Sequence, residues 1–255
     1  MTKQPAHFRD ILTPVSRARY AVWRLLGGKR PINLELKSGL RLHVRSLATT
    51  DYDIAWQMFW RGDYESPIAL PDVRNIVDLG ANVGYSCLYW CQKYPQSHIT
   101  AFEPHPVHVK AVHANLLQNG LVDRVKLVEA AAGVSERHSY LTDGRSSSAV
   151  TEQPAAFQIR VLDIFREKEH AGKIDIFKID IEGGEYDILS DPRFAALDVR
   201  LLVVEWHNTP EYPDGKSWCL EKLHGLGYQT QIGCEDLPLA GLIWAWRSDH
   251  AESVV

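Results

Sequence analysis

From Asn75 to the end of the chain, short apolar runs of strand length alternate with longer segments of helical periodicity. Strands separated by helices favour a parallel sheet, because each crossover helix returns the chain to the same end of the sheet. The expected strands of this sheet are Ile76–Leu79, His98–Phe102, Val125–Ala130, Ile174–Ile179 and Leu201–Val204, followed by a hairpin of Tyr228–Ile232 and Leu242–Trp246. A small extra strand is expected at Phe157–Val161. The pattern predicts an α/β fold with a mostly parallel, seven-stranded sheet, helices on both faces and a C-terminal antiparallel hairpin.

The first 50 residues have a different pattern and are expected to form an extension of a main domain at residues 51–255. Residues 14–26 have helical spacing, and residues 32–45 alternate as a β-hairpin. Residues 1–30 carry seven basic side chains against a single acidic one. Two interpretations of the basic helix stay open. It is either a solvated helix that packs Val15, Tyr20, Val22 and Leu25 onto the domain, or a contact for an anionic membrane or acidic partner.

Composition excludes some classes of protein. A formal net charge of -4 gives no support to a general affinity for polyanions, so nucleic acid is not expected as a partner. The four cysteines form no CxxC pair, which argues against a disulfide framework. No apolar run approaches the roughly 18–20 residues of a membrane span, and no signal-peptide core is present. We therefore expect a soluble cytoplasmic protein.

The loop Asp78–Gly84 follows the first strand of the main domain. In open α/β sheets, ligands bind beyond the carboxyl ends of the strands. Gly80 permits a tight turn close to a ligand, and Asn82 could cap the next helix. The second strand ends in Glu103-Pro104. A carboxylate in that position can accept two hydrogen bonds from a ribose diol.

A nicotinamide dinucleotide fits this arrangement less well than S-adenosylmethionine. The loop lacks the second glycine of GxGxxG, which lets the backbone approach a pyrophosphate, and Asp78 would repel phosphates. S-adenosylmethionine carries a ribose, a carboxylate, an ammonium and a sulfonium but no phosphate, so the acidic group suits it. The expected binding residues are Asp78, Gly80, Asn82, Gly84, Glu103 and Pro104, together with Asp180.

Two further strand ends carry ionisable side chains. Asp180 and Glu182 follow the fourth strand and are candidate catalytic groups, although Glu182 and Glu185 could simply favour the N-terminus of the next helix. Glu205 and His207 end the fifth strand. His207 titrates near neutrality and could serve as general base, with Glu205 orienting it or the substrate. A histidine there could equally well hydrogen-bond a loop.

A divalent cation could also activate an acceptor hydroxyl, by lowering its pKa. Asp180, Glu182 and Glu205 could supply oxygen ligands for Mg²⁺. No spacing in the sequence demands a metal, so none is expected.

Taken in this order and spacing, the motifs resemble the FkbM-type methyltransferases of the class I superfamily. The blocks are residues 77–84, 102–106, 115–119 and 178–185, preceded by Arg61-Gly62-Asp63-Tyr64-Glu65, which matches the family's Gly-x-Tyr-Glu segment. The resemblance runs from about Asp51 to His207, with Gly183-Gly184 where the family usually has Gly-Ala. It implies a Rossmann-like fold and methyl transfer from S-adenosylmethionine, often to a hydroxyl of a natural product or sugar. Glu65 and Ala130 complete the expected cofactor-binding set.

The acceptor is the open question. The leading hypothesis is O-methylation of a small molecule, with N-methylation and a non-catalytic, cofactor-binding recruitment module as alternatives. We expect the acceptor pocket around Tyr64, Glu65, Arg145 and residues 212–218.

Overall fold

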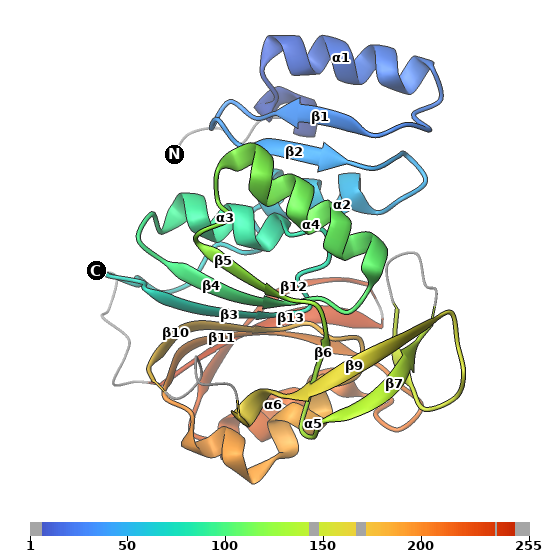
Figure 1. The fold of residues 1–255 in the computed structure, drawn as a ribbon. Coiled ribbons are helices and arrows are strands. Elements are labelled where there is room, and N and C mark those ends of the chain that lie inside the picture. Colours follow the sequence, from blue (N-terminus) through green and yellow to red (C-terminus); the bar gives the residue numbers. More distant parts are fainter. Residues whose placement is uncertain (1–6, 143–147, 167–171, 238, 248–255) are drawn as a thin grey trace.

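A computed structural model gives the fold of residues 7–142, 148–166, 172–237 and 239–247 (Figure 1). Arg145, which we expected near the acceptor, lies outside these described residues. The four cysteines are free thiols. Among the described helices, none combines the length and the apolar character that crossing a membrane requires.

The centre of the molecule is a seven-stranded sheet with the order β12-β13-β11-β10-β3-β4-β5. The strands are β3 (Asn75–Leu79), β4 (His98–Phe102), β5 (Val125–Val128), β10 (Ile174–Ile179), β11 (Val199–His207), β12 (Gln229–Leu237) and β13 (Ala240–Trp246). The strands from β11 to β5 are parallel, and β13 is antiparallel to both of its neighbours. The predicted sheet and its terminal hairpin are thus confirmed. The carboxyl ends of the parallel strands meet at one edge.

Helices cover both faces of this sheet (Figure 1). On one side lie α3 (Tyr85–Lys93) and α4 (Pro106–Asn119), and on the other α5 (Glu185–Ser190) and α6 (Gly215–Gly225). Successive strand residues point to opposite faces, so Ile76 and Val77 belong to separate apolar cores. This double burial explains why the parallel strands read as continuous apolar runs.

The N-terminal segment stacks on the outside of α4 as a helix and a hairpin. Its elements are η1 (Phe8–Ile11), α1 (Pro14–Leu25), β1 (Ile32–Glu35) and β2 (Arg41–Val44). The backbone N–H of His43 donates to Asn115 Oδ1 at 2.7 Å, and the Tyr85 hydroxyl donates to the His43 carbonyl at 2.9 Å. Hydrogen bonds from α3 and α4 therefore attach the hairpin to the central domain.

The inner face of α1 differs from the one we expected. Tyr20 is buried at 7% exposure, but Val15, Val22 and Leu25 are 69%, 55% and 86% exposed. Ser16 and Trp23 share the buried face with Tyr20 instead. The predicted packing of Val15, Val22 and Leu25 onto the domain is therefore wrong, because these residues lie on the opposite side of the helix.

Two connecting regions complete the fold. After the N-terminal hairpin, the chain forms α2 (Asp51–Trp56), which continues into a π-helical turn, η2 (Gln57–Arg61). Short 3₁₀ turns follow at η3 (Ile164–Arg166) and η5 (Pro192–Ala196).

A second sheet has the order β6-β9-β7-β8. Its strands are β6 (Ala131–Gly133), β7 (Arg137–Leu141), β8 (Val150–Thr151) and β9 (Phe157–Asp163). Only β9 was anticipated as an extra strand.

Asn115 provides a test of the attachment between hairpin and domain. Its side chain is fully buried, accepts from the His43 N–H and donates to the Val83 carbonyl at 2.8 Å. We expect N115A to destabilise the protein by about 2–4 kcal/mol in urea unfolding, because two buried backbone groups lose their partner. The control N119A removes more exposed hydrogen bonds, two to the backbone of Arg41 and one to the Asn115 carbonyl, and should cost less than about 1 kcal/mol. Equal losses in the two variants would contradict this account.

Candidate active site

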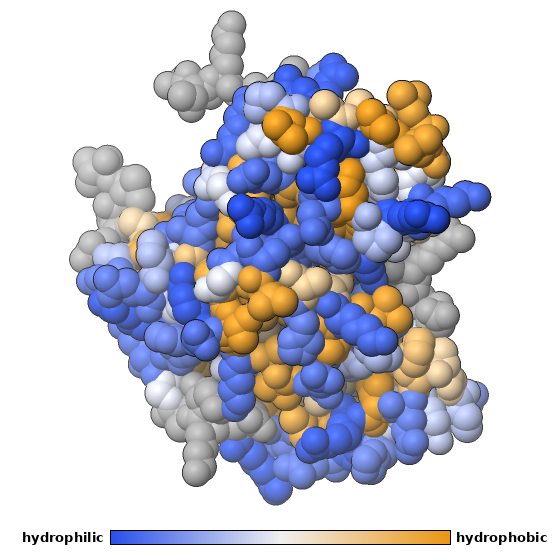
Figure 2. Space-filling model, turned by 45° about the horizontal axis from the view of Figure 1, so that its top comes forward, coloured by the Kyte–Doolittle hydropathy of each residue, from blue (hydrophilic) through white to orange (hydrophobic). Residues whose placement is uncertain are grey.

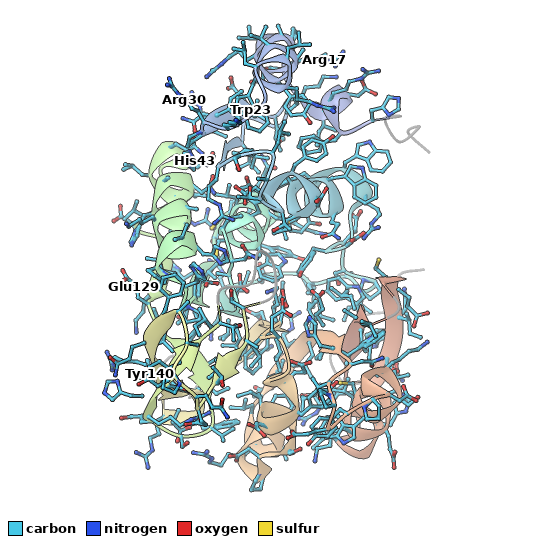
Figure 3. All side chains as sticks on the ribbon, turned by 90° about the vertical axis from the view of Figure 1, so that its right-hand side faces the viewer. Arg17, Trp23, Arg30, His43, Glu129 and Tyr140 are labelled. Atoms are coloured by element: carbon cyan, nitrogen blue, oxygen red, sulfur yellow. The ribbon has the colours of Figure 1, made fainter. Side chains whose placement is uncertain are left out.

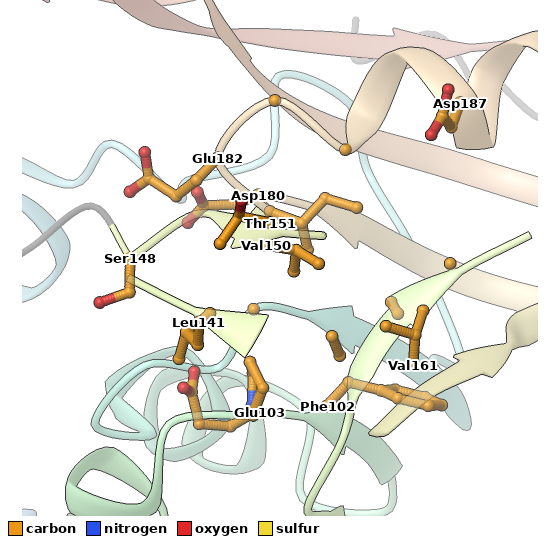
Figure 4. A pocket seen from close by; sticks show the side chains of 18 of the residues that line it. Phe102, Glu103, Leu141, Ser148, Val150, Thr151, Val161, Asp180, Glu182 and Asp187 are labelled. Carbon is orange, nitrogen blue, oxygen red and sulfur yellow. The ribbon is translucent and has the colours of Figure 1, made fainter. Parts of the chain in front are cut away.

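A cavity of about 420 Å³ opens at the carboxyl ends of β3, β4 and β10. The second sheet forms its opposite wall, through Leu141, Val150 and Val161 (Figure 4). Glu103 and Asp180 face the cavity from the ends of β4 and β10, with Glu182 just beyond (Figure 4). The cavity thus joins the predicted ribose-binding carboxylate to the predicted reaction edge.

Gly80 sets the shape of the loop after β3. It has a φ of 88°, and a Cβ at this position would lie 1.8 Å from the Asp180 carbonyl oxygen. Only glycine fits such a turn pressed against a neighbouring strand end. The N–H groups of Gly80 and Ala81 both donate to the Phe102 carbonyl, at 3.0 and 2.9 Å. The loop is therefore tied to β4 on one side and to the end of β10 on the other.

Asn82 does not cap the following helix, contrary to our prediction. The N-cap of α3 is Gly84, which has a φ of 82° and no side-chain cap. Asn82 itself has a φ of 50°, lines the cavity, and has a buried Oδ1 without a hydrogen-bond partner. The left-handed turn places Asn82 ahead of the helix, so its amide is available to a ligand. Gly84 packs against Val112 of α4 instead of lining the cavity.

Glu103 is 5% exposed and held in place by backbone donors. Its Oε2 accepts from the Asn82 N–H at 2.8 Å, and its Oε1 accepts from the His105 N–H at 2.8 Å. His108 Nδ1 lies 3.4 Å from Oε1. A carboxylate has about four acceptor positions, so capacity remains for a diol. Pro104 lines the cavity beside it.

Asp78 lies behind the loop and has no exposed surface. Ser86 Oγ donates to its Oδ2, and Lys178 Nζ lies 3.2 Å from its Oδ1. The expectation that Asp78 meets a ligand ammonium therefore needs correction, because its charge is matched inside the protein.

Lys178 is the partner that the sequence analysis missed. It is 2% exposed, and its Nζ donates to the Gly80 carbonyl at 2.7 Å and lies 3.1 Å from Asp180 Oδ2. Burial alone would lower the pKa of Lys178, but Asp180 and Asp78 raise it well above its usual range. The signal was a lysine two residues before Asp180, in a strand whose one other charged residue is Asp175.

Two expected cofactor residues, Ala130 and Glu65, are not part of the cavity wall. Ala130 is 1% exposed, and its neighbours Ala131 and Ala132 line the cavity in its place. The Glu65 side chain is 76% exposed and lies 3.8 Å from Lys93. Tyr64, beside it, is buried. Burial raises the pKa of Tyr64 well above its usual range.

Glu185 orients His207. Its fully buried carboxylate accepts from the His207 N–H at 3.0 Å and lies 3.2 Å from His207 Nδ1. The other oxygen accepts from the Gly183 N–H at 2.8 Å. With Nδ1 engaged, Nε2 faces Glu182 at 3.4 Å and Glu205 at 3.9 Å. Glu185, which the sequence could equally assign to a helix terminus, is thus a positioning residue of this cluster.

The pKa values of His207, Glu182 and Glu205 indicate which of these side chains carries a proton near neutral pH. Burial would lower the pKa of His207, but its hydrogen bond to Glu185 and the surrounding carboxylates raise it to about 10. Burial raises the pKa of Glu182 to about 7, and burial with the charge of Asp180 raises that of Glu205 to about 8. His207 is therefore an imidazolium near neutrality and has no lone pair for the general-base role that we expected. The two glutamates titrate where a base is useful.

The same cluster could also hold a divalent cation. One ligand atom each of Asp180, Glu205 and His207 lie within 4.8 Å of one another. A metal-bound histidine commonly donates its other ring N–H to a carboxylate, as Nδ1 does here toward Glu185. Occupancy by a metal would require His207 to lose its proton.

The described sequence features match a known family. Residues 78–230 match the family model for the methyltransferase FkbM domain. The chain belongs to the FkbM methyltransferase family. The match confirms the resemblance and continues past His207, whereas the segment from Asp51 to Val77 lies outside it. The matched segment is thus a methyltransferase FkbM domain.

Two curated relatives are also methyltransferases. Methyltransferase sdnD of Sordaria araneosa is 30% identical over 157 residues, covering 47% of this chain and 61% of the relative. Methyltransferase 1 of Beauveria bassiana is 29% identical over 147 residues, covering 47% and 58%. The chain thus spans about three-fifths of the length of these relatives.

A solved structure agrees on the fold. Methyltransferase FkbM from Methylobacillus flagellatus aligns with a TM-score of 0.50 at 13% identity, covering 77% of this chain and 53% of that one. The predicted Rossmann-like class I fold is confirmed.

Replacing Glu185 tests the orientation of His207. We expect E185Q to lower the pKa of His207 from about 10 toward the neutral range, because the ring loses its hydrogen-bonded anion. Long-range ¹H–¹⁵N NMR of the imidazole nitrogens measures the titration. The control E129Q removes the exposed carboxylate 3.4 Å from His113 and should leave His207 unchanged. An unaltered His207 titration in E185Q would refute the assignment.

Glu182 should make stability depend on pH. Its pKa is raised on folding, so its contribution is fully present below the usual pKa of 4.5 and is lost as the pH rises through about 7. Glutamine resembles the protonated form. We expect E182Q to unfold at a temperature about 3 °C above wild type at pH 8 and at the wild-type temperature at pH 4. E221Q, on the exposed side of α6, is the control. A difference of the same size at both pH values would count against the shift.

Proposed function

We propose that the protein transfers a methyl group from S-adenosylmethionine to a hydroxyl of a small molecule. One observation carries the proposal: Glu182, in the wall of the cavity that also contains Glu103, has a pKa raised to about 7. A base is most effective when its pKa lies near the working pH. Hydroxyl acceptors need such a base, because their own protons are held tightly.

The described residues fit the proposed cofactor. Gly80 lines the cavity, Asn82 Oδ1 has no partner, and Glu103 retains acceptor capacity in the wall. Glu103 would hold the ribose hydroxyls, and Asn82 would bind a polar group nearby. When bound, S-adenosylmethionine supplies an electrophilic methyl group, which the acceptor oxygen takes while the carbon–sulfur electron pair stays on sulfur.

The chain's own residues would handle the acceptor proton. Glu182 accepts it as the oxygen–carbon bond forms, so that the carboxylate becomes a neutral acid. His207, positioned by Glu185, contributes a positive charge 3.4 Å from Glu182 and steadies its ionised form before transfer. Lys178 neutralises Asp180 beside them.

A transfer assay with methyl-labelled S-adenosylmethionine tests this proposal. Three acceptor pools are offered: hydroxylated small molecules, primary and secondary amines, and total RNA. We expect label in the hydroxyl pool, and a loss of about 100-fold or more in E182Q, because the proton has no acceptor. E221Q should keep wild-type activity.

Other outcomes would overturn the proposal. Label in the amine pool alone, unaffected by E182Q, would indicate N-methylation, since amines need little help from a base. Label in RNA would assign a nucleic acid as acceptor. Full activity of E182Q on hydroxyls would remove Glu182 from the mechanism.

A further inference from the structure

The outer face of α1 is a second apolar stripe. Val15, Val22, Leu25 and Leu26 are 69%, 55%, 86% and 79% exposed. At about 100° per residue they fall on one side of the helix, opposite Tyr20 and the rest of the buried face. Ala18 lies within the stripe and Ala21 at its edge, so no polar side chain interrupts it.

Arginines flank this stripe on both sides. At the same helical spacing, Arg17 and Arg24 fall along one border and Arg19 along the other. Lys29 and Arg30 follow the helix and are also exposed. Figure 3 looks along α1 and shows Arg17 at the flank of the helix. An apolar face bordered by basic residues is typical of helices that lie in a membrane interface.

The charge of the chain is strongly divided. Residues 1–30 carry a net charge of +6, while the whole chain carries -4, so the remaining residues carry -10. An anionic surface would attract the N-terminal end and repel the remainder. Electrostatics alone would therefore turn α1 toward such a surface.

The position of α1 in the fold agrees with this orientation. The helix is the outermost layer of the molecule, separated from the central sheet by the hairpin and α4 (Figure 1). Apolar and strongly hydrophilic side chains lie side by side at this end of the molecule (Figure 2). As the outermost layer, α1 is open to contact with a surface outside the molecule.

We propose that α1 docks the protein on an anionic lipid surface. Leu25, Leu26 and Val22 enter the headgroup region, and Arg17, Arg19 and Arg24 contact lipid phosphates. A second copy of the chain is a poorer partner, because a symmetric contact through this face would bring the arginines of both copies together. The proposal does not depend on the methyl acceptor, since α1 lies apart from the cavity.

Vesicle flotation tests this docking. We expect the wild-type protein to float with phosphatidylcholine vesicles that contain phosphatidylserine, and not with phosphatidylcholine alone. L25Q/L26Q should weaken binding by about tenfold, through loss of inserted apolar surface. R19Q/R24Q should weaken it by roughly fivefold per arginine, and added salt should do the same.

Matched control variants distinguish vesicle binding through the stripe from unspecific binding. L117Q/L239Q changes leucines that are 73% and 64% exposed elsewhere, and R41Q/R160Q removes two exposed arginines outside α1. Both should bind vesicles as wild type does. All variants change exposed side chains, and circular dichroism and melting temperature confirm that each is folded.

Three results would overturn the proposal. The first is the absence of wild-type binding to anionic vesicles at low salt. The second is equal binding by L25Q/L26Q and wild type, which would reduce the effect to unspecific charge attraction. The third is a change from dimer to monomer in L25Q/L26Q by light scattering, which would assign the stripe to self-association.

Discussion

The buried ammonium of Lys178 holds the reaction edge together. It reaches the Gly80 carbonyl, Asp78 and Asp180 from the middle of the sheet, at the point where β3 and β10 end side by side. A buried charge is tolerated only when it is paired and hydrogen-bonded. Without the lysine, two carboxylates would face each other in an apolar sheet, and the loop carbonyl would lose its donor. The loop shape and the placement of Asp180 both depend on this one contact.

Glu185 and His207 belong to a second set of charged residues at the reaction edge. Glu185 is fully buried and engages both the backbone and the ring of His207, so the ring points toward Glu182 and Glu205. The backbone of Glu182 has a φ of 53°, which residues other than glycine rarely adopt. Such strain is commonly found at functional sites. The cluster thus combines an ordered imidazolium with carboxylates whose burial keeps their protons exchangeable near neutral pH.

Much of this arrangement was predictable, because it depends on local periodicity. The apolar runs at β3, β4 and β10 defined the strands, and the end of each strand located Gly80, Glu103 and Asp180 at one edge. What failed depends on contacts between distant segments. The pairing of Asp78 with Lys178 arises only when β3 and β10 are neighbours, and the protonation of His207 depends on Glu185, which is 22 residues away.

Prediction of the inner face of α1 from the sequence was limited in the same way. Apolar residues at helical spacing identified the helix. Its sequence carries two apolar stripes, however, and the stripe that packs on the protein is the one that contains Tyr20 and Trp23. The second sheet was mostly missed because its strands are short and two of them have only two or three residues.

The central claim is that the cavity between Glu103 and Asp180 binds the methyl donor. A crystal structure of the protein with S-adenosylhomocysteine tests it most directly. The account predicts that the ribose hydroxyls lie within hydrogen-bond distance of Glu103 and that the ligand contacts the loop at Gly80 and Asn82. A ligand bound elsewhere, or a cavity that stays empty at saturating ligand, would contradict it.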